Sequence, residues 1–131
     1  MFSNEVTGSF NFLDKETLTE VIEVAELQNK PVFMEFYTDW CLPCKIMDEE
    51  VFTNHELGRF FNDSFVSYKV DAESTNGNNL AFLYRVKVYP TLIFVDHKGR
   101  ELLRENGSVS VAELKELGIR ARQLYDKISM P

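Results

Sequence analysis

The sequence lacks several features that define large classes of protein. Two cysteines among 131 residues leave no room for a network of disulfides, and a chain with 44% hydrophobic residues is long enough to bury the core of a single domain, residues 1–131, without one. No cluster of lysine or arginine is present, and the formal net charge is −7. We therefore expect no binding to nucleic acid or to anionic membranes, because both depend on clustered positive charge.

Long apolar runs are missing as well. The longest of them, such as Thr91–Val95, are far shorter than the roughly 20 residues that cross a bilayer, so we expect no insertion into a membrane. The segment Met1–Glu5 has none of the basic, apolar and cleavage regions of a secretory signal. As it stands, the sequence predicts a cytoplasmic protein. A signal peptide removed from a natural precursor would place the protein in the periplasm instead.

Hydrophobic patterning predicts an α/β domain in which a mixed central sheet has helices on both faces. Val32–Tyr37 is apolar almost throughout, which is typical of a strand buried on both sides. Residues 73–79 have the composition of a loop. The other predicted strands lie at 9–12, 65–70, 91–95 and 100–104. Helices are predicted at 18–25, with Asp14 as the cap, and at 80–84 and 111–124. A further helix is predicted from residue 41, with a break near 51–54, where Thr53 or Asn54 caps its second piece.

Both cysteines lie in the stretch Trp40-Cys41-Leu42-Pro43-Cys44-Lys45, where the predicted buried strand gives way to a helix. A thiol reacts as its thiolate, and an ordinary cysteine with a pKa of about 8.5 is mostly protonated at neutral pH. Unpaired N–H groups and the dipole at a helix start favour the anion. We therefore predict that Cys41 is the attacking nucleophile and that Cys44, about one turn deeper, resolves the mixed disulfide. This exchange needs no cofactor.

Three other roles for the cysteine pair remain open. Half of a zinc site would need two more ligands, but His55 and His97 are far apart in the sequence and match no zinc-finger spacing, so we expect no metal. We expect both histidines at the surface or in turns. A structural disulfide would close a loop too short to stabilise the chain much. Two inert thiols would also suit the core of a binding module.

The cysteine stretch and a later proline resemble the thioredoxin family. Trp-Cys-x-x-Cys-Lys follows a buried strand, and Tyr89-Pro90-Thr91 precedes a later one. The resemblance covers nearly the whole chain and implies a thioredoxin fold with thiol–disulfide oxidoreductase activity on protein disulfides. It also implies that the Tyr89–Pro90 peptide bond is cis and faces the cysteines. Trp40, Tyr89 and Pro90 would then form the surface that binds the substrate.

Glu35 lies in the middle of the predicted buried strand, where a charge is costly unless it is paired or neutralised. The family places a buried acid, usually aspartate, at this distance before the first cysteine, so the resemblance implies that Glu35 relays protons to and from Cys44. The lysine that many thioredoxins carry near this acid would fall at Ser67, so a raised pKa of Glu35 would have to arise without it. Alternation along a strand leaves open that Glu35 points to solvent instead.

Several positions depart from the family pattern. Leu42-Pro43 replaces the common Gly-Pro pair, and Val88 and Tyr89 replace smaller residues before the proline, which predicts a substrate groove that is narrower or differently shaped. Residues 44–54 resemble the thioredoxin-like domains of bacterial disulfide-interchange and isomerase-type proteins, whose dithiol often receives electrons from a membrane partner. We therefore expect protein disulfides as substrates and a reductase or a membrane electron donor as a partner.

Two functions compete with a reducing thioredoxin. One is a disulfide isomerase or interchange domain of an extracytoplasmic pathway, and the other is a redox-silent adaptor that binds an extended peptide beside Pro90. Lys45 either assists thiolate formation or is a solvated helix residue. Asp39 is expected at the solvated surface.

Overall fold

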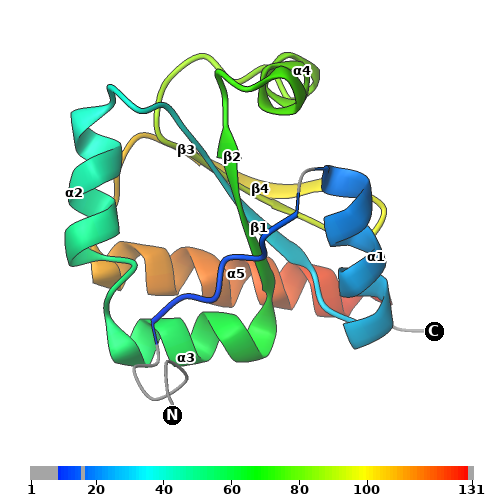
Figure 1. The fold of residues 1–131 in the computed structure, drawn as a ribbon. Helices are drawn as coiled ribbons and strands as arrows, with labels where there is room; N and C mark the ends of the chain where they lie inside the picture. The colour runs from blue at the N-terminus through cyan, green and yellow to red at the C-terminus, as the bar shows by residue number, and fades with distance from the viewer. Residues whose placement is uncertain (1–8, 16, 130–131) are drawn as a thin grey trace, which may run out of the picture.

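A single mixed sheet organises the chain, as the sequence predicts. The computed structural model describes residues 9–15 and 17–129. The strands lie in the order β2-β1-β3-β4, with β1 parallel to β2 and antiparallel to β3, and β3 antiparallel to β4 (Figure 1). The strands are β1 (Val32–Tyr37), β2 (Val66–Asp71), β3 (Thr91–Val95) and β4 (Glu101–Asn106).

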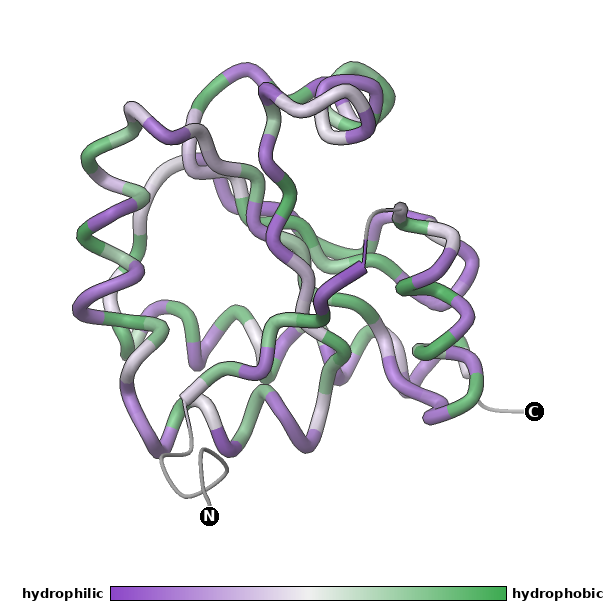
Figure 2. The backbone as a smooth tube through the Cα atoms, viewed as in Figure 1, coloured by the Kyte–Doolittle hydropathy of each residue, from purple (hydrophilic) through white to green (hydrophobic). Residues whose placement is uncertain are grey.

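Helices cover both faces of this sheet. Buried side chains of α1 and α4 join one apolar cluster with β1, and those of α2, α3 and α5 join a second cluster on the opposite face. The helices alternate between hydrophilic and hydrophobic segments, as expected when one side of each packs on a core (Figure 2). The helices are α1 (Leu18–Gln28), α2 (Leu42–Glu50), α3 (His55–Ser64), α4 (Thr75–Leu83) and α5 (Val111–Ser129).

The central strand β1 is fully enclosed, because neighbouring strands pair with both of its edges and helices cover both faces of the sheet. Its side chains alternate between the two clusters, as the period of a strand requires. Met34 and Phe36 belong to the cluster with α1 and α4, whereas Phe33 belongs to the cluster with α2, α3 and α5. Glu35 follows Phe33 by two residues, so its carboxyl group lies on the face that α2 covers.

Two predicted features of the N-terminal part are wrong. Residues 9–12 form no strand in the sheet, and only an isolated parallel bridge joins Phe12 to Ser67. The cap of α1 is Thr17 rather than Asp14. Thr17 Oγ1 accepts a hydrogen bond from the Glu20 N–H at 3.3 Å, and the Glu20 carboxylate accepts one from the Thr17 N–H at 3.1 Å. This reciprocal pair satisfies two N–H groups, one more than the Thr17 side chain would satisfy alone.

The predicted break between α2 and α3 is confirmed. Asn54 is the N-cap of α3, and its Oδ1 accepts a hydrogen bond from the Leu57 N–H at 2.8 Å. The polar stretch 73–79, predicted as a loop, instead contains most of α4. Ser74 caps this helix by accepting a hydrogen bond from the Gly77 N–H at 3.0 Å, and Ala81 anchors it to the core. Capping and packing therefore override the low helix propensity of the asparagines and the glycine.

No helix within residues 9–15 and 17–129 is both long and apolar enough to cross a bilayer.

Gly77 provides a test of how closely α4 packs on the end of β2. A Cβ atom at this position would lie 1.8 Å from the Asp71 carbonyl oxygen, which belongs to the backbone and has little freedom to move. We expect Gly77→Ala to lower the free energy of unfolding by about 1–3 kcal/mol, although alanine favours a helix more than glycine does. Chemical denaturation measures this change. Asn79→Ala, at an exposed position of the same helix, is the control and is expected to be neutral or stabilising. A stable Gly77→Ala protein would contradict the close contact.

Candidate active site

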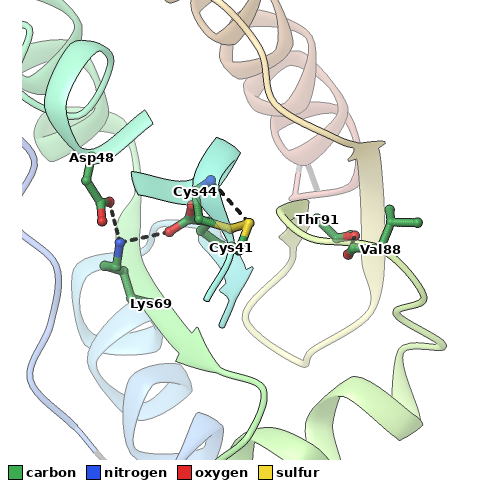
Figure 3. Close-up of a disulfide and its surroundings, with 7 residues drawn as sticks. Cys41, Cys44, Asp48, Lys69, Val88 and Thr91 are labelled. Atoms are coloured by element: carbon green, nitrogen blue, oxygen red, sulfur yellow. Dashed lines mark hydrogen bonds and ion pairs between the residues drawn. A yellow bond between two sulfur atoms is a disulfide. The ribbon is translucent and has the colours of Figure 1, made fainter. Parts of the chain in front are cut away.

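The two cysteines form a disulfide at the start of α2. Cys41 is the N-cap residue and Pro43 lies in the first turn, where its missing N–H costs nothing. The Cys41 sulfur accepts a hydrogen bond from the Cys44 N–H at 3.2 Å (Figure 3). The Cα atoms of the pair are 5.3 Å apart, within the range of ordinary disulfides. The sulfur of Cys41 therefore takes the place that an oxygen occupies in a usual helix cap.

Solvent exposure does not separate the two cysteines. Cys41 is 3% exposed and Cys44 is 2% exposed in this oxidised form. The two cysteines differ in their position along the helix. The sulfur of Cys41 lies at the N-cap and accepts a hydrogen bond from the Cys44 N–H, which has no carbonyl partner within the helix. Negative charge on sulfur is therefore stabilised best at Cys41.

The segment before β3 contributes the second part of the site. The Tyr89–Pro90 peptide bond is cis, which confirms the expectation from the family resemblance. Thr91 Oγ1 donates a hydrogen bond to the Val88 carbonyl at 2.7 Å, and Figure 3 draws both residues among the surroundings of the disulfide. The Pro90 carbonyl accepts a hydrogen bond from the Gly107 N–H at 2.8 Å. Within the part of the chain that the structure describes, no hydrogen bond involves the N–H or the carbonyl of Tyr89.

Trp40 connects this segment with the start of α4. Its exposed indole ring lies edge-on to the Tyr89 ring, with 6.1 Å between the ring centroids. The indole N–H donates a hydrogen bond to the Glu73 carboxylate at 2.8 Å. The structure therefore brings the side chains of Trp40 and Tyr89 into contact, and Trp40 directly precedes Cys41.

Glu35 is fully buried, so the alternative that it points to solvent is wrong. It pairs in register with Lys69 across β1 and β2, and the Lys69 ammonium lies 2.9 Å from Glu35 Oε1. This approach is an ion-pair contact, and neither carboxylate oxygen has a hydrogen-bond partner of good geometry among the described residues. Asp48 on α2 holds the same ammonium at 2.6 Å (Figure 3).

Burial raises the pKa of Glu35 from 4.5 to about 7. Loss of hydration is the largest cause, because it penalises the charged carboxylate. The charge and the contact of Lys69 oppose this rise, and the negative charge of Asp48 adds to it. Glu35 can therefore gain or lose a proton near neutral pH.

Lys69 is the site residue that the sequence analysis missed. The expectation that the lysine partner of Glu35 is absent, because Ser67 occupies the family position, is wrong: the lysine lies two residues later on the same face of β2. The signal was the strand period of two, since positions 67, 69 and 71 face the same side. The ammonium also lies 4.8 to 5.4 Å from three aromatic ring centroids, those of Tyr37, Phe12 and Phe52.

The remaining candidates are two residues that flank the dithiol and two histidines. Lys45 and Asp39 are exposed. His55 begins α3, and His97 lies in the turn between β3 and β4 with its Nδ1 2.9 Å from the Tyr125 hydroxyl. Across the described ranges, no group of three or more histidine, cysteine, aspartate or glutamate side chains is arranged to hold a metal ion.

Comparison with known proteins agrees with this geometry. A sequence model of the thioredoxin-like domain matches residues 18–121. The thiol:disulfide interchange protein DsbD of Salmonella typhi is 28% identical over 102 residues, which are 76% of this chain and 18% of that protein. DsbD of Cronobacter sakazakii is 34% identical over 89 residues, or 66% of this chain and 15% of that protein. The chain thus spans less than a fifth of the length of these relatives.

Solved structures show the same fold. A putative disulphide-isomerase from Bacteroides thetaiotaomicron is 32% identical with a TM-score of 0.75, and the match covers 86% of this chain and 95% of that one. A thioredoxin from Thermus thermophilus is 25% identical with a TM-score of 0.74, and the match covers 86% of each chain. The sheet order, the cis proline and the dithiol at a helix start agree with these likenesses. The chain therefore belongs to the thioredoxin-like family.

Proposed function

We propose that this chain exchanges disulfides with protein substrates, with Cys41 as the attacking thiol and Cys44 as the resolving thiol. The observation that carries the proposal is the N–H hydrogen bond on the sulfur of Cys41 at the N-cap of α2, which favours a thiolate in the reduced protein. Cys44 lies in the following turn, within bonding distance of Cys41, as their disulfide demonstrates.

The proposed reaction has two steps. The Cys41 thiolate attacks one sulfur of the substrate disulfide, and the other substrate sulfur leaves as a thiolate that takes up a proton. The Cys44 thiol then loses its proton and attacks the sulfur of Cys41. This forms the Cys41–Cys44 disulfide and releases the second substrate sulfur. The substrate gains two electrons and the dithiol loses them, so a separate dithiol donor must reduce the protein again.

Glu35 is proposed to accept the proton of Cys44 in the second step. Its carboxyl group lies on the face of β1 that α2 covers, and Cys44 is one of the buried residues of α2. With a pKa raised to about 7 by burial, the carboxylate is basic enough to compete for a thiol proton near neutral pH. Lys69 offsets part of the negative charge of the Glu35 carboxylate before it takes up this proton.

Trp40, Tyr89 and Pro90 are proposed to bind the substrate segment next to its disulfide. Trp40 and Tyr89 present an aromatic surface, and the N–H and carbonyl of Tyr89 are available to pair with an extended chain. The names of the relatives favour an interchange role, in which a reductase or a membrane partner supplies the electrons. A protein with that interchange role would lie in the periplasm. A general thioredoxin would instead lie in the cytoplasm and receive electrons from a reductase.

Single cysteine variants test the two roles. Cys41→Ser is expected to abolish reduction of insulin disulfides, because no nucleophile remains at the N-cap. Cys44→Ser is expected to accumulate a mixed disulfide between Cys41 and the substrate, visible by mass spectrometry without reductant. Retained activity in Cys41→Ser would contradict the assignment. A redox-silent adaptor would show no insulin reduction by the unmodified protein.

Replacing Glu35 tests the proton transfer. Glu35→Gln is expected to slow closure of the Cys41–Cys44 disulfide on a preformed mixed disulfide by on the order of 100-fold above pH 7, where the carboxylate is charged. Rapid-quench measurement of the released thiol gives this rate. Glu49→Gln, which changes an exposed acid on α2, the helix that carries Cys44, is the control. Equal closure rates in both variants would remove Glu35 from the reaction.

The same variant also tests how the free energy of unfolding of the unmodified protein depends on pH. Because the pKa of Glu35 is higher in the folded chain, about 7, than its ordinary 4.5, the folded state loses stability as pH rises between these values and through the upper one. The loss amounts to about 3 kcal/mol by pH 8. We expect Glu35→Gln to lack this loss, so that its advantage over the unmodified protein in urea unfolding grows from pH 4 to pH 8. A difference independent of pH would contradict the raised pKa.

A further inference from the structure

A pocket separate from the disulfide lies where α4 ends and the chain turns toward β3. Its volume is about 590 Å³, and its walls come from the last residues of α4 and from the segment 85–89. Figure 1 places α4 and the start of α2 at the same end of the sheet. The pocket therefore opens at the end of the molecule that carries the disulfide.

Two large apolar side chains beside this pocket are exposed to solvent. Phe82 is 87% exposed and Leu83 is 68% exposed. The neighbouring Ala81 fills the inward position on α4, so Phe82 and Leu83 belong to the outer side of the helix. Exposed apolar groups that adjoin a hollow are typical of surfaces that bind a partner.

The charge of the pocket is opposite to that of the whole chain. Arg85 and Lys87 line it, and none of its lining residues is acidic. Neither cation takes part in a salt bridge among the described residues. In a chain with a formal net charge of −7, this local positive charge favours a negatively charged ligand.

Arg85 occupies a backbone position where a side chain is unfavourable. Its φ is 57°, in the left-handed region, and its N–H donates to the Phe82 carbonyl at the end of α4. Glycine is the usual residue at such a helix end, and any other residue costs roughly 1 kcal/mol there. Strain of this kind at an exposed cation suggests that the side chain has a function.

Tyr89 joins the pocket to the proposed substrate surface. It lines the pocket and its ring contacts the ring of Trp40 beside the disulfide. A polypeptide that pairs with Tyr89 therefore lies next to the pocket.

We propose that this pocket is a docking site for a segment of the partner protein that alternates acidic and apolar residues and adjoins the disulfide to be exchanged. Phe82 and Leu83 would pack on its apolar side chains, and Arg85 and Lys87 would contact its carboxylates. The inference rests on the proposed function, because it assigns a substrate preference to the same exchange reaction.

Binding of peptides without cysteine tests the docking site apart from the redox chemistry. The probes are two labelled peptides, one alternating aspartate with phenylalanine and one alternating lysine with phenylalanine, titrated with the oxidised protein by fluorescence anisotropy. We expect the acidic peptide to bind about tenfold more tightly, since exposed charge pairs contribute modestly. The double variant Arg85→Gly with Lys87→Gln is expected to remove the difference, and Phe82→Ser to weaken the binding of both peptides severalfold.

Matched controls separate docking from folding. Arg85→Gly relieves the left-handed strain, so it is expected to be at least as stable as the unmodified chain. Leu27→Ser removes a leucine that is 88% exposed on α1 and is expected to leave peptide binding unchanged. Equal binding of the two peptides, or no effect of the double variant, would overturn the proposal. Self-association that Phe82→Ser abolishes would also overturn it, because the occupant would then be a second copy of this chain.

A second readout keeps this inference distinct from the proposed function. Exchange of the reduced protein with oxidised glutathione reports the dithiol chemistry without docking. Normal exchange together with equal peptide binding would overturn only the docking site. Failure of exchange together with selective peptide binding would overturn the proposed exchange reaction and leave the pocket as a binding site. When the acidic sequence is joined to a disulfide-bonded loop, we expect its reduction to be about tenfold faster than that of the lysine peptide.

Discussion

The hydrogen bond from the Cys44 N–H to the sulfur of Cys41 is the interaction on which the site depends. It exists because β1, held at both edges by β2 and β3, delivers the chain to a fixed point where α2 begins. Pro43 strengthens this start, since its ring suits the first turn of a helix. A rigid sheet therefore sets the position of a sulfur atom, and the helix supplies the partial positive charge that stabilises it.

A second set of charges lies on the same face of the sheet. Lys69 is shared between buried Glu35 and partly exposed Asp48, and three aromatic rings surround its ammonium. A lysine held by two acids neutralises Glu35 only in part, so loss of hydration still dominates and the pKa rises. The arrangement suits a group that must exchange a proton repeatedly. A fully paired carboxylate would stay charged, and an unpaired one would stay protonated.

The parts of the fold that depend on continuous apolar patterning could be predicted from the sequence. The strands β1 and β3 have the predicted bounds, because a run of apolar residues next to a proline leaves few alternatives. The cap of α1 and the start of α4 were harder to predict from the sequence. Both Asp14 and Thr17 are residue types that cap helices, and the sequence alone does not choose between them. The helix α4 depends on contacts with the end of β2, which a local sequence pattern does not contain.

The residues of the site likewise fall into those that the sequence predicts and those that it does not. The dithiol, Trp40 and the cis proline were predicted from motifs whose spacing is local or matches the family. Lys69 was missed because its contact with Glu35 depends on the register between β1 and β2. The family pattern places the lysine at Ser67, two residues before its position in this chain. The buried state of Cys41 was likewise set by packing rather than by sequence neighbours.

The pH dependence of alkylation at Cys41 measures whether the start of α2 stabilises the thiolate. The reduced Cys44→Ser variant leaves one thiol and retains the N–H group at position 44. Its reaction with iodoacetamide would be followed from pH 4 to pH 10. We expect the alkylation rate of Cys41 to reach half its maximum at a lower pH than the alkylation rate of free cysteine does, because the helix start stabilises the thiolate. A midpoint equal to or above that of free cysteine would contradict it.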